Sequence, residues 1–399
     1  MSSTLTTAEL QTIARKLDES LQQERYAGWD PFDALNSKLF NVTPLRHVPV
    51  ARLALTQLFK RSPYNLRKYA GVPKSVNAVT IALAAEVARR ECHMDEAALL
   101  VKQLIEMRVQ DDGDGLRAWG YPFPWQAKAF FVARNSPNII ATAYAVRELM
   151  NWRNNAAVPG ASDAILSAAK LVASRFVVAT EDNRRFIAYV PQSRAMVHNA
   201  SLWGAYVLTA GVAAGGPEPW LRLAEDAVNY SLAAQGQDGS WAYGEARHHQ
   251  FVDGFHTGYV LEALHRISRI APHMDVAAAL AKGVAFYQEN MFEADGTAKY
   301  YSRSAWPIDA NPAAQAVITF NELGLSDAGA RSREIMTAAV RNLWLEDQGH
   351  FAYQKSKRGI TAINYPRWTQ IWLRVALSLI LERPDTVLPV ARLPQAAHA

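Results

Sequence analysis

The sequence has little cysteine, no long apolar run and no extended run of basic residues. Cys92 is the only cysteine among 399 residues, so a disulfide within the chain is excluded and a catalytic thiol would need other support. Residues 1–20 form a polar, amphipathic pattern and lack the apolar stretch that export or membrane spanning requires. We therefore expect a cytoplasmic protein, peripheral to the inner membrane only through partner proteins.

The charges are balanced and spread thinly along the chain. Lys and Arg number 42 and Asp and Glu number 37, which gives a net charge of +5. No basic run exceeds a few residues, so nucleic acid is excluded as an expected partner. Half of the residues are hydrophobic, which is enough for a large core and argues against disorder.

A repeated unit is the strongest feature that the sequence does contain. Five segments share one order: an aromatic or extended stretch, a loop, and then an apolar helix, as in "DGSWAYGEARHH" followed by "DGFHTGYVLEALHRI". With one further apolar helix, "SVNAVTIALAAEVARRE", they predict six inner helices that are packed on all sides. These helices are expected to start near residues 77, 138, 198, 256, 309 and 364.

Between the inner helices lie helices with a narrower apolar stripe and more charge. They are expected at 94–109, 161–176, 217–235, 274–292 and 327–346. The alternation predicts an all-α fold, an (α/α)6 toroid with two concentric layers of helices; an open helical solenoid is the alternative. We expect a single domain over 1–399, with an N-terminal helix and lid at 1–45 and a C-terminal tail at 384–399.

In such a ring every inner helix begins at the same rim, so the aromatic loops converge on one concave cup. Aromatic faces beside amide, hydroxyl and guanidinium groups suit a ligand with many hydroxyls and one apolar face, namely a sugar. We expect an oligosaccharide, a polysaccharide repeat unit or an activated sugar. The side chains expected to bind it are Trp119, Tyr121, Trp125, Asn138, Arg194, Asn199, Trp241, Tyr301, Trp306, Tyr365, Arg367 and Trp368.

Three short motifs bear on terpene, calcium or zinc chemistry. "QGQDGSW" at 235–241 resembles the QxxxGxW repeat of terpene cyclases and prenyltransferases, which pins an outer helix to the following turn. The acidic string "DDGDG" at 111–115 has neither the spacing that terpene protonation needs nor the Gly and Glu of a calcium loop. "HHQFVDGFH" at 248–256 lacks the helical histidine pair of zinc sites. We therefore expect no metal and no cofactor.

Several longer stretches carry a family resemblance that covers nearly the whole chain. "YAGWDPFDALNSKLF", "WGYPFPWQAKAFF", "VHNASLWGA", "DGSWAYGE", "FVDGFHTGYVLEAL" and "NYPRWTQIW" are similar to bacterial exopolysaccharide-biosynthesis proteins of the VpsJ type. The resemblance implies a six-hairpin toroid and a role in surface-polysaccharide synthesis, with a glycosyltransferase or membrane assembly complex as partner. The wider toroid group includes sugar epimerases, polysaccharide lyases and glycosidases.

Proton transfer at a sugar carbon needs a base poised near neutral pH and an acid opposite it. His198 and His256 lie 58 residues apart, one repeat, at the mouths of adjacent inner helices. Phenols beside a cation can share this role, and Asp309 is the best-placed carboxylate. The candidate catalytic residues are His198, His256, Tyr189, Tyr243, Tyr259 and Asp309.

Three classes of function follow from these residues. The first is a sugar epimerase, isomerase or lyase that works through His and Tyr, with Arg194 or Arg367 holding a substrate carboxylate. The second is a glycoside hydrolase, which needs a carboxylate pair drawn from Asp30, Asp33, Asp253, Asp309 and Glu245. The third is a non-catalytic glycan-binding or scaffold component of a polysaccharide assembly complex.

Overall fold

The computed structural model describes residues 4–110, 114–126, 131–191 and 193–382. The expected tail at 384–399 and the start of the acidic string at 111–115 lie outside these residues. Within them the chain is mostly helical, with two layers of helices. The inner layer consists of α5 (Ala78–Arg90), α7 (Ile139–Leu149), α9 (His198–Ala213), α11 (Gly254–Ile270), α13 (Ala310–Glu322) and α15 (Ile371–Leu381).

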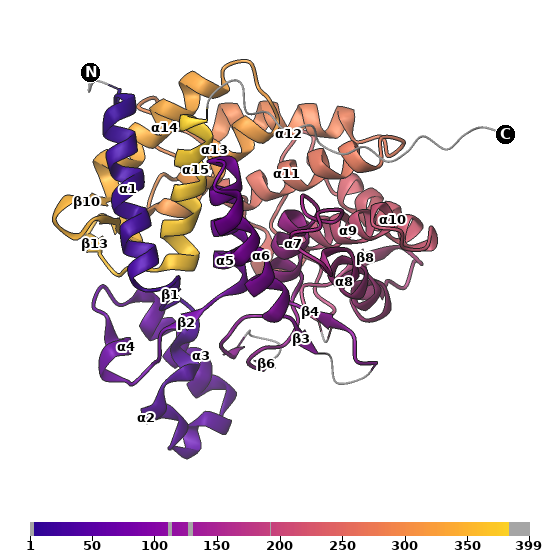
Figure 1. Cartoon of the computed structure of the whole chain (residues 1–399), viewed down its shortest axis with the longest axis horizontal. Coiled ribbons are helices and arrows are strands. Elements are labelled where there is room, and N and C mark those ends of the chain that lie inside the picture. Colours follow the sequence, from indigo (N-terminus) through magenta and orange to yellow (C-terminus); the bar gives the residue numbers. More distant parts are fainter. Residues whose placement is uncertain (1–3, 111–113, 127–130, 192, 383–399) are drawn as a thin grey trace.

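The inner helices form a closed ring. Each one packs against the next in the order α5, α7, α9, α11, α13, α15, and α15 packs back against α5 (Figure 1). Small residues permit this close packing; in α11, for example, a Cβ at Gly258 would collide with the side chains of Gln315 and Thr319 in α13. The contact between α15 and α5 confirms the toroid and excludes the open solenoid.

The outer layer consists of α6 (Met94–Glu106), α8 (Ala161–Arg175), α10 (Pro219–Ala233), α12 (Ala277–Asn290), α14 (Ala328–Leu343) and α1 (Thr7–Gln23). Helix α1 begins with a capping box, in which Thr6 and Glu9 satisfy each other's backbone N–H groups. Its apolar stripe, including Leu10 and Leu17, is buried against the ring, and the helix packs on α15. The N-terminal helix thus completes the last hairpin from the opposite end of the chain.

The predicted helix starts agree with the structure to within two residues for the first five inner helices. The sixth starts at Ile371, later than predicted, because the segment Pro366–Gln370 first makes a π-helical turn. Pro366 has no N–H to donate, and the first residue of a helical turn does not need one. The turn can therefore begin at this proline.

Short antiparallel strands brace the loops between helices. The two-stranded pairs are β1 (Ala27–Gly28) with β2 (Ser75–Val76), β3 (Val109–Gln110) with β4 (Arg117–Ala118), β5 (Trp125–Gln126) with β6 (Phe131–Val132), β7 (Val177–Ala179) with β8 (Arg185–Ile187), and β10 (Trp344–Leu345) with β11 (His350–Phe351). A three-stranded sheet has the order β13 (Gly359–Thr361), β12 (Gln354–Ser356), β9 (Ile308–Asp309), with Gln354 opposite Asp309.

Residues 27–76, which we call the lid, leave the ring along β1 and return along β2. Between these strands the lid contains η1 (Asp33–Asn36), α2 (Lys38–Asn41), η2 (Pro44–His47), α3 (Pro49–Arg61) and α4 (Leu66–Tyr69). Its small core is formed by Ala34, Phe59 and Val72. Figure 1 shows α2, α3 and α4 projecting from the ring as a separate lobe. The lid therefore extends well beyond residue 45, where the sequence placed its end.

Charged residues inside the ring form a buried network. Arg147 of α7 donates to Glu86 of α5 and to Glu262 of α11, and Arg266 of α11 pairs with Glu322 of α13. Burial is the largest single effect on Glu86 and would raise its pKa, but Arg147 and neighbouring arginines lower that pKa to about 2. Because the charges are paired, the network ties four inner helices together.

The QxxxGxW segment connects two outer helices. The Gln235 side-chain amide donates to the carbonyl of Gly239 at 3.0 Å and to that of Ala279 in α12 at 2.9 Å. The Trp241 indole donates to the carbonyl of Ser231 in α10 at 2.8 Å. The Trp241 bond holds the turn after α10 against that helix, which is the role that the resemblance implies, and the Gln235 bonds hold the same turn against the start of α12.

Replacing Gln235 by Ala should lower the free energy of unfolding by about 1–2 kcal/mol, because two hydrogen bonds to partly buried carbonyls are lost. Gln237 lies two residues away and is exposed, so Gln237→Ala is the matched control. Urea unfolding of both variants provides the measurement. Equal stabilities for the two variants would contradict the connecting role of Gln235.

Candidate functional site

The rim of the ring is built by one hydrogen bond that repeats from hairpin to hairpin. The first N–H groups of four inner helices, at Ile139, His198, Gly254 and Ala310, donate to the carbonyls of Tyr189, Tyr243, Tyr300 and Tyr353, at 3.0, 3.1, 3.0 and 3.4 Å. Each tyrosine belongs to the loop of the following hairpin. These donors have no partner within their own helix, so the neighbouring loop satisfies them and is fixed beside the helix mouth.

Polar side chains cap three of these helix starts and the start of α5. Asn77, Asn138, Asp253 and Asp309 are the N-cap residues of α5, α7, α11 and α13, and each accepts a hydrogen bond from a backbone N–H of its own helix. All four side chains are buried. The partial positive charge of each helix N-terminus is thus directed toward the rim.

Contacts between rings join the loops into an aromatic surface that we call the rim cluster. Its members are Tyr121, Trp125, Tyr189, Tyr243, Phe251, Phe255, His256, Tyr259, Tyr300, Tyr301 and Trp368. The hydroxyls of Tyr121 and Tyr189 lie 3.0 Å apart. The Arg367 guanidinium packs over Tyr121 and over Trp368, 5.0 Å from each ring centre, and so joins the two halves of the cluster.

An aspartate and a histidine form a dyad at the mouth of α11. Asp253 Oδ1 accepts the backbone N–H of His256 at 2.8 Å, and its Oδ2 accepts the Nδ1–H of the same residue at 2.6 Å. The carboxylate is buried, whereas the imidazole is 22% exposed and lies 4.4 Å from the ring of Tyr243. Since the carboxylate can only accept, it fixes the tautomer with hydrogen on Nδ1 and leaves the Nε2 lone pair available.

Asp309 lies one helix further around the ring and is almost completely buried. Its Oδ1 accepts the N–H of Asn311 at 2.8 Å, and its Oδ2 accepts the side-chain amide of Gln354. Burial raises the pKa of Asp309 to about 6, although these two hydrogen bonds and the charge of Lys60 oppose the shift. Asp309 therefore holds a proton in mildly acidic solution and is suited to act as an acid.

Rim tyrosines are also held in their protonated form. Burial raises the pKa of Tyr189, Tyr243 and Tyr259 above the usual value of 10, with smaller contributions from neighbouring charges and hydroxyls. At neutral pH these phenols donate hydrogen bonds or protons, and they cannot serve as bases. Tyr259 already donates to Asn311 at 3.0 Å.

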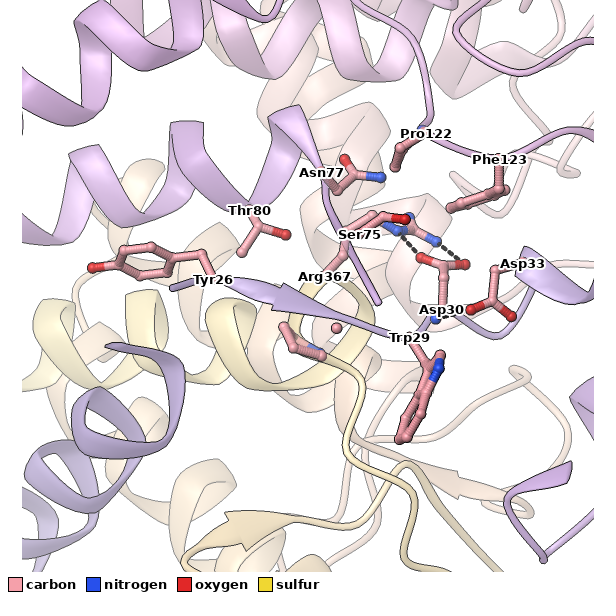
Figure 2. A pocket seen from close by; sticks show the side chains of 12 residues that line it. Tyr26, Trp29, Asp30, Asp33, Ser75, Asn77, Thr80, Pro122, Phe123 and Arg367 are labelled. Atoms are coloured by element: carbon pink, nitrogen blue, oxygen red, sulfur yellow. Dashed lines mark hydrogen bonds and ion pairs between the residues drawn. The ribbon is translucent and has the colours of Figure 1, made fainter. Parts of the chain in front are cut away.

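One buried ion pair fastens the lid to the rim, and a second buried pair lies within the lid. Asp30 binds the Arg367 guanidinium through both carboxylate oxygens, and Asp33 accepts from Arg67 at 2.5 Å. Arg67 also donates to the hydroxyl of Tyr365 at 2.8 Å. Figure 2 shows Asp30 and Arg367 facing each other in the pocket under the lid. The cavity there is about 10 Å³, room for about one water molecule.

Other lid side chains reach the rim cluster itself. Phe32 packs edge-on against Trp368, with ring centres 5.4 Å apart. Lys60 lies 4.5 Å from the ring centre of Phe32, and burial lowers its pKa while the charge of Asp309 opposes that shift. The lid thus covers the Trp368 side of the cluster and delivers a cation toward Asp309.

The structure brings nine of the predicted site residues together in or against the rim cluster: Tyr121, Trp125, Tyr189, Tyr243, His256, Tyr259, Tyr301, Arg367 and Trp368. Arg367 is already paired with Asp30, so its guanidinium is not free to grip a substrate carboxylate.

The remaining predicted residues lie elsewhere or are held by the protein. Trp119 is fully buried and donates to the carbonyl of Leu104, and Trp241 belongs to the outer-helix connection described above. His198 is buried, and its Nδ1 lies 3.4 Å from Ser231 Oγ of the outer helix α10. Burial lowers the pKa of His198 to about 4, so it stays neutral. The others are Asn138 and Asn199, both buried; Arg194, exposed; Trp306, partly buried beside Ser304; and Tyr365, bound to Arg67.

Sequence reasoning gave too little weight to Asp253, Asp30, Phe32 and Lys60. The first could have been found, because Asp-x-x-His at a helix start places the carboxylate against both the backbone and the ring of His256. The other three act across the lid, and no local pattern indicates a contact 337 residues away in the chain. In the described ranges, no three His, Cys, Asp or Glu side chains are grouped to hold a metal ion.

Solved structures of carbohydrate-active proteins share this fold. A polysaccharide lyase aligns with a TM-score of 0.58 at 10% identity, over 96% of this chain and 99% of that one. An unsaturated glucuronyl hydrolase from Streptococcus agalactiae aligns at 0.56 with 13% identity, over 94% and 93%. A sugar epimerase from a ruminal bacterium aligns at 0.54 with 13% identity, over 78% and 90%.

Neither the protein-family models nor the curated protein sequences give a match to this chain. The likeness to the three enzymes rests on low identity and therefore establishes the six-hairpin toroid fold alone. The chain shares its architecture with a lyase, an epimerase and a hydrolase.

Asp309 should make folding stability depend on pH. Its pKa rises from 3.8 in the unfolded chain to about 6 in the folded one, so the folded state binds the proton more tightly. Its contribution is most favourable at low pH, and about 3 kcal/mol is lost as pH rises from about 4 to about 6. Asp309→Asn has no carboxyl group to titrate and should not lose this stability. As the pH rises from about 4 to about 6, the variant should therefore gain stability relative to the wild type. Urea unfolding at several pH values measures it; a constant difference would refute the shift.

Breaking the Asp30–Arg367 pair should be costly. In Asp30→Asn the buried Arg367 guanidinium loses its counter-charge, and we expect a loss of about 3–5 kcal/mol in the free energy of unfolding. Asp182→Asn breaks the exposed pair with Arg184 and should change stability little. If both variants unfold at the same urea concentration, the lid is not fastened by this pair.

Proposed function

We propose that this protein is a sugar epimerase or lyase that transfers a proton at a ring carbon, with His256 as the general base. The observation that carries the proposal is the Asp253–His256 dyad, in which a buried carboxylate orients an imidazole that is itself partly exposed among aromatic side chains. Asp253 is a positioning residue, because it acts through His256. Tyr243, whose phenol stays protonated, is the proposed acid.

The reaction begins when His256 Nε2 removes a proton from the carbon next to a carboxylate or carbonyl of the sugar. Negative charge then develops on the substrate oxygen, where protonated tyrosine hydroxyls and the N-termini of the inner helices stabilise it. If a protonated rim tyrosine across the substrate from His256 returns a proton on the opposite face, the product is an epimer. If the bond to a leaving group at the next carbon breaks instead, the product is an unsaturated sugar, and the leaving oxygen takes the proton.

The rim cluster supports a carbohydrate substrate. The side-chain rings of Trp125, Tyr243 and Tyr301 offer flat apolar faces of the kind on which sugar rings stack. The tyrosine hydroxyls lie at the edges of these rings. We propose an oligosaccharide, a polysaccharide repeat unit or an activated sugar, processed in surface-polysaccharide synthesis as the VpsJ-type resemblance implies. A glycosyltransferase or assembly complex is the proposed protein partner. Because the cavity beneath the lid holds about one water, its lining side chains, which include Trp29 and Phe123, must shift when a sugar enters there.

The deciding experiment uses NMR to follow neutral and uronic oligosaccharides that are incubated with the protein in deuterium oxide. We expect deuterium at a ring carbon or new unsaturated signals, lowered by 10²–10⁴-fold in His256→Gln and lowered also in Asp253→Asn. His248 lies exposed on the same loop, so His248→Gln is the matched control and should retain the rate. Unchanged exchange in His256→Gln would overturn the assignment of the base.

Asp309 favours a second candidate function, glycoside hydrolysis. A carboxyl group with a raised pKa is what a general acid requires, and Asp253 caps the adjacent helix as a possible partner carboxylate. Hydrolysis predicts new reducing ends that disappear in Asp309→Asn and persist in His256→Gln. If the NMR signals of the oligosaccharide shift but neither deuterium exchange nor new reducing ends appear, the result would instead support a non-catalytic glycan-binding role.

A further inference from the structure

The lid has a charge composition unlike the rest of the chain. From residue 34 to residue 85 the sequence contains no Asp and no Glu, whereas the whole chain contains 37 of them. The same stretch holds eight of the 42 basic residues: Lys38, Arg46, Arg52, Lys60, Arg61, Arg67, Lys68 and Lys74. The positive net charge of the protein is therefore concentrated on one lobe.

Within the described residues, some of these cations have ion-pair or aromatic partners and others have no ion-pair partner. Arg67 pairs with Asp33, Lys74 pairs with Glu24, Arg52 packs over Phe131, and Lys60 points toward the rim. The side chains of Lys38, Arg46, Arg61 and Lys68 are exposed, and none of them forms an ion pair within the described part of the chain. Four positive charges thus remain available to an external anion.

Apolar side chains are exposed between these charges. Of the thirteen large apolar side chains exposed in the described residues, eight lie in this lobe: Leu39, Val42, Leu45, Val48, Val50, Leu58, Tyr64 and Tyr69. Val42, Val50 and Tyr69 are each at least 75% exposed. The whole segment 44–50, "PLRHVPV", is solvent-exposed. A lobe with so little core of its own leaves an apolar surface that a soluble monomer rarely shows.

We propose that the lid docks directly on the surface of a bilayer that contains anionic lipid. Interleaved basic and apolar side chains match the interface of such a bilayer, where Lys and Arg reach the phosphate groups while Leu, Val and Tyr enter the boundary with the acyl chains. Nucleic acid would match the charge and leave the aliphatic side chains in water. No helix in the described ranges is long and apolar enough to cross a membrane.

Docking would have a geometric consequence. Asp30, Phe32 and Lys60 fasten the same lobe to the rim cluster, and Figure 1 shows the lobe projecting from the ring. A bilayer bound to the lobe therefore lies next to the rim loops. This inference does not depend on the reaction proposed above, because it rests on residues outside the rim cluster.

Vesicle co-sedimentation tests the proposal with the full chain. We expect the protein to bind vesicles of phosphatidylglycerol and phosphatidylcholine, to bind pure phosphatidylcholine much less, and to be released by high salt. The double variant Arg61→Gln/Lys68→Gln should bind about 25-fold less tightly, since each charge near an anionic surface contributes about five-fold. Val42→Ser/Val50→Ser should also bind less tightly.

The matched control is Leu99→Ser, because Leu99 is exposed on the outer helix α6, away from the lid. It should bind the vesicles as the wild type does, and circular dichroism checks that each variant is folded. Failure of the folded wild type to bind anionic vesicles would overturn the proposal. Binding that is equally strong in both lid variants would overturn it as well, since the lobe would then not be the contact.

Discussion

The rim depends on the hydrogen bond between the first N–H of an inner helix and a tyrosine carbonyl in the next hairpin. It is repeated at Ile139, His198, Gly254 and Ala310, and it satisfies donors that a buried helix start would otherwise leave without a partner. The same bond places an aromatic side chain beside each helix mouth. The repeat that stabilises the ring is thus also the repeat that builds the aromatic surface, which explains why structural and candidate functional residues share one spacing in the sequence.

Charge is divided between two parts of the ring. Along the inner helices, Arg147, Glu86 and Glu262 form a paired network that holds the helices together. At the rim the acidic groups have different tasks: Asp253 orients His256, and Asp309 carries a raised pKa. The network along the inner helices does not include the rim aspartates, and enzymes with different chemistries share this architecture.

The sequence predicted the ring well, because periodicity and composition report burial. Inner helices such as α9 are apolar on every side, and this alone located five of six starts. It could not separate His198 from His256, since both follow the same loop pattern; their difference lies in what the folded chain packs around each ring. The roles of Asp30 and Lys60 could not be predicted for another reason. Their contacts join the lid to segments that are distant in the sequence, and such contacts leave no local pattern.

We propose that His256 faces the reacting carbon of a sugar. A crystal structure of the Tyr243→Phe variant with a bound uronic oligosaccharide would test this placement, since loss of the proposed acid should slow turnover and retain binding. We expect a sugar ring against the rim cluster with a carbon-bound hydrogen directed at His256 Nε2, the carbon about 3–3.5 Å away. A sugar bound with its ring carbons out of reach of His256 would contradict it.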